Sequence, residues 1–255
     1  MKRIAFCLLF FSLFGNFCNA QSSIRLGIKG GISIPNLKSS GDNNPVSTGW
    51  SSRQGPYFGV LAEWEISKRL YIQSELNYSS QGGKKDGIQA IPGAPYAGYF
   101  PPGTTVPKYF YAEYDNEAKL NYLELPVLIK VDFPFGENFS FFIDGGPYAA
   151  YLVSAKNITS GSSNVYSDEK LTMPVLPSQI SFDATSDVKN DIKNFNIGIQ
   201  GGIGISYSLS EKSSLLFSAG GNYGFIPIQK DEINGKSHTG AATLTIGYLV
   251  GLGNK

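Results

Sequence analysis

Cysteine, histidine and net charge are all scarce in this chain. The only cysteines, Cys7 and Cys18, lie within the first twenty residues, so the rest of the chain has no thiol for a disulfide, a zinc site or a nucleophile. There is one histidine, His238, and the formal net charge is +1. That charge gives no basic footprint for nucleic acid, so we expect no nucleic-acid partner.

Long apolar runs are absent except at the start of the chain. A basic residue, Lys2, precedes an apolar run over Ile4–Phe14 and a small-residue cleavage site that ends at Ala20. This layout predicts a cleaved signal peptide over residues 1–20 and an exported domain over 21–255. The run is shorter than the ~20 residues that span a bilayer, and no later run of ~18 apolar residues predicts a transmembrane helix.

The remaining sequence alternates with a period of two. In "FNIGIQGGIGISYSL" (195–209), apolar residues or glycine occupy every odd position, and Asn, Gly, Gln or Ser occupy every even one. Such alternation predicts β-strands with one apolar face and one polar face. Eight segments share it: Ile24–Leu37, Tyr57–Ser67, Leu70–Ser80, Leu120–Phe133, Phe139–Ala155, Phe195–Leu209, Leu215–Ile228 and Thr239–Leu252.

The connections between these segments alternate in length. Residues 68–69, 134–138 and 210–213 are short turns, whereas 38–56, 81–119, 156–194 and 229–238 are longer. This organisation predicts an all-β fold: an eight-stranded antiparallel up-and-down transmembrane β-barrel with short periplasmic turns and long extracellular loops in a bacterial outer membrane.

A water-soluble barrel would show the same period with the opposite orientation. The polar face decides between them, because it is rich in Gly, Ser, Asn and Gln rather than in the Lys, Glu and Thr of a solvated sheet. Small residues suit the narrow interior of an eight-stranded barrel. We therefore expect the apolar face to meet lipid. Aromatic residues near both strand ends would form interfacial girdles: Trp64, Phe133, Phe139, Tyr207, Phe217 and Tyr248 at the turn end, and Phe58, Tyr78, Tyr151, Phe195, Tyr223 and Phe225 at the loop end.

In this orientation, ionisable side chains point into the lumen. They are Arg25, Lys29, Glu63, Glu65, Glu75, Glu124, Lys130 and Asp144. Ionisable groups in a poorly hydrated interior need partners, so we expect a charge network that plugs the lumen. The alternative is a charged constriction in a small channel. Glu124 and Lys130 are three pleats apart on one strand, and we expect each to pair with a neighbouring strand.

Two loops are richer in apolar and aromatic residues than solvation requires. "IPGAPYAGYFPPGTTVPKYFYAEY" (91–114) combines Pro, Gly and Tyr, and "KLTMPVLPSQISF" (170–182) is apolar. Apolar surface outside a membrane marks interaction sites, and we expect one at Tyr96, Tyr99, Phe100, Tyr109, Tyr111, Leu171, Met173 and Leu176. The alternative is that these loops fold back over the barrel mouth or extend the strands as hairpins.

Catalytic and ligand-binding signals are weak. His238 lies beside Ser237 and near Asp231 and Glu232, but loop neighbours of this kind arise by chance, and we expect no catalysis there. The glycines of "GIQGGIG" lie in mid-strand with no helix to follow, so they predict no nucleotide site. "GDNN" (41–44) and "SDEK" (167–170) lack the spacing of a calcium loop. We expect no metal and no cofactor.

Several segments together resemble the PorT-like outer-membrane β-barrel family of Bacteroidetes. The most specific is "LNYLELPVLIKVDF" (120–133), which resembles the "YLEIPLLLK"-like strand of that family. "LGIKGGISI" (26–34), "GPYAAYL" (146–152) and "GIQGGIGISYSL" (198–209) also match, whereas "FSAGGNYGFIPI" (217–228) lacks the arginine of the corresponding family strand. The resemblance implies an eight-stranded outer-membrane barrel. The family takes its name from a component needed for type IX secretion, although most of its members have no assigned role.

These features favour a non-enzymatic outer-membrane barrel whose lipid-embedded strands present extracellular loops to envelope or secretion proteins. Two alternatives remain open at this point. One is a narrow passive pore for small solutes, and the other is an enzyme at the loop rim that acts on lipid or peptide.

Overall fold

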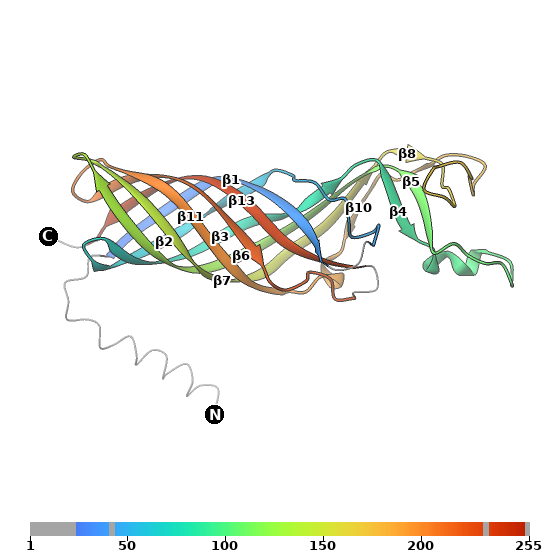
Figure 1. Ribbon diagram of the computed structural model, residues 1–255, viewed down its shortest axis with the longest axis horizontal. Helices are drawn as coiled ribbons and strands as arrows, with labels where there is room; N and C mark the ends of the chain where they lie inside the picture. Colours follow the sequence, from blue (N-terminus) through green and yellow to red (C-terminus); the bar gives the residue numbers. More distant parts are fainter. Residues whose placement is uncertain (1–23, 41–43, 232–234, 253–255) are drawn as a thin grey trace, which may run out of the picture.

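Eight long strands form a closed antiparallel barrel (Figure 1). The computed structural model describes residues 24–40, 44–231 and 235–252, so the predicted signal peptide lies outside the described residues. The barrel strands are β1 (Ile24–Ser40), β2 (Gly55–Ser67), β3 (Leu70–Lys85), β6 (Asp115–Phe135), β7 (Phe139–Ser160), β11 (Phe195–Ser208), β12 (Ser213–Gly224) and β13 (Lys236–Gly251). The predicted eight-stranded up-and-down barrel is confirmed.

Neighbouring strands pair in sequence order, and β13 pairs back to β1 to close the ring. In the closing pair Ile28 lies opposite Tyr248. Three tight turns, 68–69, 136–138 and 209–212, lie at one end, which we call the turn end. The longer connections lie at the other, the loop end. Closure leaves no open strand edge around the barrel wall.

Apolar side chains cover the outside of the barrel, and most polar and charged side chains of the strands point inside. Ile28 is 63% exposed and Ile129 61%, whereas the next residue on the opposite face, Lys130, is 1% exposed. This is the inverse of a water-soluble protein, and such a surface requires an apolar surrounding. Within the part of the chain that is described, no helix has the length and apolarity needed to cross a membrane.

Aromatic rings gather at both ends of this apolar band, as predicted. At the turn end, the ring of Phe139 lies 4.8 Å from that of Tyr207, between centroids. At the loop end, Phe58 stacks on Tyr78 at 5.0 Å and Tyr151 meets Phe195 edge-on at 5.1 Å. Aromatic side chains at these two levels match the interfacial girdles of a transmembrane barrel.

The strands continue well past the barrel at the loop end. β3 pairs with β6 as far as Lys85 opposite Asn116, and β6 pairs with β7 as far as Asp115 opposite Ser160. The three predicted strands were therefore too short: β3 runs past Ser80, β6 begins before Leu120, and β7 runs past Ala155. Beyond the band the side chains no longer alternate between lipid and lumen, so the hydropathy signal stops while the backbone pairing continues.

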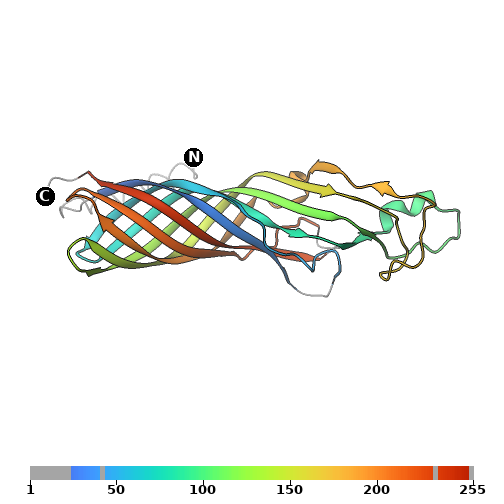
Figure 2. The same ribbon diagram turned by 90° about the horizontal axis from the view of Figure 1, so that it is seen from above.

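Residues 81–119 and 156–188 together form what we call the extension (Figures 1 and 2). Strand β10 (Ala184–Asp187) adds to the edge of β7. The outer part consists of two hairpins, β4 (Ile88–Pro92) with β5 (Tyr109–Glu113) and β8 (Ser162–Ser163) with β9 (Ile180–Ser181), and of the 3-10 helix η1 (Ala94–Tyr99). A second 3-10 helix, η2 (Lys189–Asp191), follows β10. Both views show the extension projecting from one end of the barrel.

One predicted strand was too long. The segment Leu215–Ile228 ends as β12 at Gly224, and the chain then leaves the sheet. Pro227 has no backbone N–H to donate to a ladder, which disfavours a further strand there. Ile228 instead packs inside the loop end of the barrel.

Candidate functional site

A buried ion network closes the lumen near the turn end. Glu63, which is fully buried, binds Arg25 Nη2 through Oε2 at 2.5 Å and accepts a hydrogen bond from Lys130 Nζ through Oε1 at 2.8 Å. Asp132 lies 3.7 Å from Arg25 and 3.8 Å from Lys130. We call these four residues the Glu63 network. Two cations against two carboxylates make it neutral, which is what a desolvated interior requires.

An apolar layer lies against this network. Leu61, Phe142, Leu216 and Leu249 are buried together inside the barrel, and Lys130 Nζ lies 4.3 Å from the centre of the Phe142 ring. The lumen is therefore filled partly by large apolar side chains, not only by the small polar ones that the alternation indicated. The Phe142 ring fits in the lumen because position 204 is glycine: a Cβ there would lie 2.3 Å from the ring.

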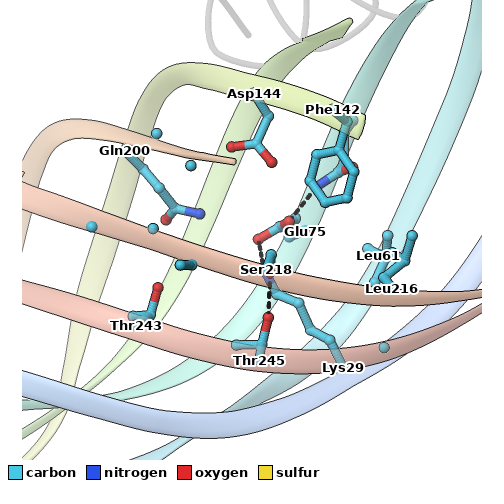
Figure 3. A pocket seen from close by; sticks show the side chains of 17 residues that line it. Lys29, Leu61, Glu75, Phe142, Asp144, Gln200, Leu216, Ser218, Thr243 and Thr245 are labelled. Atoms are coloured by element: carbon cyan, nitrogen blue, oxygen red, sulfur yellow. Dashed lines mark hydrogen bonds and ion pairs between the residues drawn. The ribbon is translucent and has the colours of Figure 1, made fainter. Parts of the chain in front are cut away.

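A second ion pair lies in the middle of the lumen (Figure 3). Lys29 Nζ donates to Glu75 Oε2 at 2.6 Å, and the same carboxylate accepts hydrogen bonds from Gln73 and from Asn77 at 2.7 Å. Asn77 also donates to the Tyr57 hydroxyl at 2.8 Å. The Glu75 side chain is 1% exposed, so this cluster fixes one arrangement across β1, β2 and β3.

A small cavity of about 30 Å³ lies beside the Lys29–Glu75 pair. Asp144 and Gln200 point toward it, and Ser218 and Thr245 form a hydrogen bond of 2.6 Å at its wall (Figure 3). One buried water needs roughly 10–15 Å³ of such space, so the cavity has room for a few waters and for no larger solute.

Glu124 lies above this cavity, toward the loop end. It is 1% exposed and accepts hydrogen bonds from Gln81 at 3.2 Å and from Asn222 at 3.3 Å. Among the described residues it makes no ion pair. Lys130 binds Glu63 on β2, which lies beyond the adjacent strand β3, so the expectation that Lys130 pairs with a neighbouring strand was wrong.

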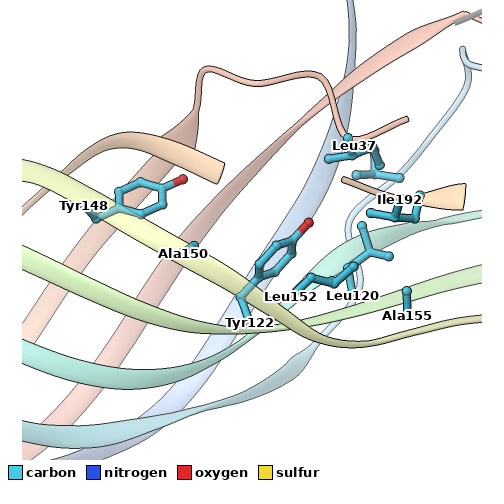
Figure 4. Close-up of a cluster of buried hydrophobic side chains, with 9 residues drawn as sticks. Leu37, Leu120, Tyr122, Tyr148, Ala150, Leu152, Ala155 and Ile192 are labelled. Carbon is cyan, nitrogen blue, oxygen red and sulfur yellow. The ribbon is translucent and has the colours of Figure 1, made fainter. Parts of the chain in front are cut away.

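The loop end of the lumen is closed by an apolar plug (Figure 4). Barrel residues supply most of it, and the connecting loops add Ile192 and Ile228, which are 8% and 4% exposed. Their backbones are joined to the barrel, because Lys193 N–H donates to Ile228 O and Ile228 N–H donates to Ser237 O, each at 2.8 Å. The buried members are Leu37, Leu120, Tyr122, Tyr148, Ala150, Leu152, Ala155, Ile192 and Ile228. We call this set the plug.

The loop between β1 and β2 is also tied to the barrel mouth. Arg53, 5% exposed, donates through Nε to Glu117 Oε1 at 2.8 Å and through Nη1 to Ser80 and to the Gln81 carbonyl. Burial acts to raise the pKa of Glu117, but hydrogen bonds from Arg53 and Lys119 outweigh it and hold that pKa below its usual value. We call the Arg53–Glu117 pair the tether.

The turn end, in contrast, opens into a cavity of about 470 Å³. Its lining is polar and includes Glu65 and Lys68, and its inner wall is formed by Arg25 and Asp132. The cavity therefore ends on the Glu63 network as a blind vestibule.

The structure thus divides the predicted lumen residues. It joins Arg25, Glu63 and Lys130 in one network and Lys29 with Glu75 in another, and it leaves Glu65 at the vestibule. Asp132 was missed. It continues the even-numbered inward face of β6 after Lys130, so the alternation already contained the signal.

The extension carries an apolar groove of about 540 Å³ between two arms. The first arm is residues 88–113 and the second is 161–182. Phe110, 4% exposed, lies at the base, where Phe100 stacks on it at 5.9 Å and Tyr96 meets it edge-on at 6.3 Å. The groove is lined by Ile91, Tyr96, Tyr99, Phe100, Phe110, Val165, Val175, Leu176, Ile180 and Phe182.

Four of the eight predicted loop residues line this groove: Tyr96, Tyr99, Phe100 and Leu176. The other four do not: Tyr109 and Tyr111 lie on β5, and Leu171 and Met173 lie in the hairpin turn of the second arm. The structure also bears out the alternative for these loops, because they extend the strands as hairpins. The aromatic base at Phe110 and Phe182 was missed, although both residues belong to the quoted loop sequences.

The two arms are joined by backbone hydrogen bonds. Tyr111 N–H donates to Tyr166 O and Tyr166 N–H donates to Tyr111 O, both at 2.8 Å. In the turn beyond Tyr166, the Asp168 carboxylate accepts hydrogen bonds from the backbone N–H groups of Thr172 and Met173. Leu171 has φ 58°, in the left-handed region that bulky residues rarely adopt. This turn is therefore held in a defined conformation.

Among the described residues, the structure does not bring the Ser237 hydroxyl to the His238 ring. Ser237 and His238 are consecutive on β13, so their side chains point to opposite faces. Ser237 is fully buried, and its hydroxyl has no hydrogen-bond partner among the described residues. The His238 ring stacks on Tyr223 at 5.7 Å, and its Nδ1 lies 3.0 Å from the Gly224 carbonyl. Glu232 lies outside the described residues.

Comparison with known proteins places this architecture in context. A family model described as "Outer membrane protein beta-barrel domain" matches residues 19–230, which include every strand from β1 to β12. No curated protein matches the sequence. The chain is similar to the crystal structure of Neisserial surface protein A at 12% identity and a TM-score of 0.41, over 91% of this chain and 97% of that one. It is similar to the outer membrane protein OprG from Pseudomonas aeruginosa at 11% identity and a TM-score of 0.38, over 92% of this chain and all of that one.

Proposed function

This chain belongs to the outer membrane protein β-barrel domain family, and on that premise we propose that it is a non-conducting, non-enzymatic anchor that presents its extension to protein partners outside the cell. The protein lies in the outer membrane, with its apolar face in lipid. In such barrels the short turns face the periplasm and the longer connections face the exterior. The extension, at the loop end, therefore projects outward.

The observation that carries this proposal is the pairing of a filled lumen with strands that run on past the membrane. The plug, the Lys29–Glu75 pair and the Glu63 network occupy three successive levels of the lumen. A solute would have to displace apolar side chains at the plug and break buried ion pairs at the other two levels, which is costly in a desolvated interior. These contacts support an anchor over a pore.

The length of the strands supports a presenting role. β6 has 21 residues, which corresponds to ~70 Å of strand at ~3.3 Å per residue. The apolar band of an outer-membrane barrel is only ~25 Å tall. Much of β6 and β7 therefore serves to hold the two arms away from the membrane. The resemblance to PorT-like proteins suggests secretion or envelope assembly as the setting in which partners act.

A narrow pore is the second candidate, and the vestibule of about 470 Å³ is the observation that favours it. A conducting state would require the Glu63 network, the Lys29–Glu75 pair and the plug to open together. The two candidates differ in conductance. Purified protein in a planar lipid bilayer should give no stable unitary current steps. An Ile192→Gly, Ile228→Gly variant, which removes the two plug side chains that the loops supply, should give none either, because the ion networks remain. Steady unitary steps from the wild-type chain that are abolished by substitution of Glu63 would contradict the anchor proposal.

The presenting role is tested by removing the first arm. Residues 88–113 are replaced by a short Gly-Ser linker, and intact cells are treated with a membrane-impermeant crosslinker. We expect the wild-type chain to form discrete crosslinked complexes with other surface proteins and the variant to lose them. The matched control carries the same linker inserted in the 209–212 turn, which faces the periplasm. Complexes that persist without the first arm would show that the extension is not the presenting surface.

A further inference from the structure

We infer that the groove between the two arms is the docking site for an uncharged, apolar segment of a partner polypeptide, which inserts one or two bulky side chains between them. This inference rests on the proposed function, because it names the part of the extension that the partner contacts and the chemistry of the contacting segment.

The chemistry of the groove defines its occupant. None of the ten lining residues carries a charge at neutral pH, and its only side-chain polar groups are the hydroxyls of Tyr96 and Tyr99. A charged group placed there would lose its hydration without gaining a partner. The volume of about 540 Å³ falls in the range of sites that enclose a compact apolar group. The occupant is therefore apolar and uncharged where it enters.

The groove is preformed. Its base is packed by the Phe100–Phe110 stack, and next to it the rings of Tyr114 and Phe182 stack at 4.4 Å. The Tyr111–Tyr166 backbone pair holds the arms together, and Asp168 fixes the turn of the second arm. A partner would not have to order these loops on binding, which removes a large entropic cost of association.

The bilayer around the barrel does not cover the groove. On β6, Leu123 pairs with Tyr151 of the loop-end girdle, and Phe110 lies 13 positions earlier in the chain, which is ~43 Å of extended backbone. Figures 1 and 2 both show β4 and β5 beyond the end of the barrel. The occupant must therefore come from outside the surrounding membrane.

The apolar surface continues past the groove, which favours a polypeptide over a small molecule. Tyr99 at the rim is 87% exposed, and Met173, two residues before the lining residue Val175, is 61% exposed. A small molecule enclosed by the groove would leave Met173, and the part of Tyr99 that faces away from the groove, in water. A protein segment would cover them, and the exposed charges of Glu169 and Lys170 in the adjacent turn would supply the polar rim that protein interfaces have.

Site-specific photocrosslinking in intact cells tests the inference. The full chain carries p-benzoylphenylalanine in place of Tyr99, and this residue is the probe. This probe is placed in two versions of the chain. One keeps the natural groove, and the other also carries Leu176→Asp, which places a charge in the groove lining. The matched control is Ser178→Asp, which adds the same charge in the same loop at an exposed position outside the lining. Ile180→Asp on the same arm serves as a second groove variant, and the mobility shift of unheated samples on gels confirms that each barrel is folded.

We expect one protein-sized adduct with the natural groove and with Ser178→Asp. With Leu176→Asp and with Ile180→Asp, the yield of this adduct should fall at least about tenfold. Mass spectrometry should place the crosslink in a partner segment free of charged residues. Equal yields in all variants, no adduct with the natural groove, an adduct of small-molecule mass, or a crosslink in a charged segment would each overturn the inference. If the groove variants keep their complexes while removal of residues 88–113 abolishes them, the groove inference fails and the proposed function stands; complexes that survive that removal contradict the proposed function itself.

Discussion

The barrel and the extension differ in which of their side chains are exposed. In the barrel, Ile129 is 61% exposed and Lys130 is 1% exposed. In the extension, Phe110 is 4% exposed, while Glu169 and Lys170 lie on the surface. In the barrel the apolar strand face points outward to lipid, whereas the extension, which water surrounds, buries apolar side chains at the base of the groove and leaves others exposed at its rim. The comparison shows that alternation defines two faces and that the surrounding medium decides which face is buried.

Charges differ between the two regions in the same way. Glu63 in the barrel is fully buried and must be matched by Arg25 and Lys130. Glu117 of the tether is 24% exposed in its side chain, so water shares in its solvation. Ion pairs of the first kind are costly to break singly, and those of the second kind contribute less.

Substitution of Glu63 should have the largest effect on the stability of the barrel. Glu63→Ala leaves Arg25 and Lys130 buried without their shared carboxylate, and we expect a loss of ~3–5 kcal/mol in the free energy of unfolding. Urea titration of the protein in lipid vesicles measures this loss. Glu137→Ala, at an exposed turn position, is the control and should change stability by no more than ~0.5 kcal/mol. An unfolding midpoint unchanged in Glu63→Ala would mean that the network does not stabilise the barrel.

The same substitution, isoleucine to arginine, should cost more stability in the barrel than in the extension. Ile203→Arg puts a charge on the lipid face near the middle of β11, where we expect a cost of ~2–4 kcal/mol. Ile88→Arg makes the same change on β4, where Ile88 is 45% exposed, and it should cost ~0.5 kcal/mol or less. Both are read from the same urea titrations. Equal costs at the two positions would contradict the assignment of the first to lipid and the second to water.

The smallest effect is expected at the tether, and it depends on pH. The pKa of Glu117 is held below its usual value, so the contribution of the pair is complete above the ordinary carboxyl range and is lost as the pH falls through the lowered pKa. Amide hydrogen exchange, corrected for intrinsic rates, should then accelerate at Ser51 and Arg53, whose N–H groups donate to the Lys84 and Pro35 carbonyls.

Glu117→Gln should reproduce that acceleration at neutral pH, and amides in the middle of β11 should stay protected in both experiments. If exchange at Ser51 and Arg53 is the same in Glu117→Gln as in the natural chain, the tether does not hold the β1–β2 loop.

Much of the barrel was predictable because its signals are local. The alternation in residues 195–209 identified β11 and its two faces, and the short turns gave the topology. The inward charges Arg25, Glu63, Lys130, Lys29 and Glu75 were also identified from their positions in each strand. Asp132 was within reach of the same reasoning. What the alternation did not give was that Lys130 passes over β3 to reach Glu63 on β2, because that contact depends on side-chain length and barrel curvature.

The loops were less predictable because their contacts are distant in sequence. Nothing near Ile192 or Ile228 indicates that they close the barrel mouth together with Leu37 and Leu152. Tyr96 and Leu176 were recognised as members of an apolar surface, but the groove exists only because Tyr111 and Tyr166 join two arms more than fifty residues apart.

The sequence by itself determined the strands, their two faces and the inverted placement of polar and apolar residues, because each of these follows from neighbours within a few positions along the chain. Only the tertiary structure decided which charges meet, how the lumen is closed and where an apolar groove forms. These depend on register, curvature and loop packing, which bring together residues that no local pattern connects.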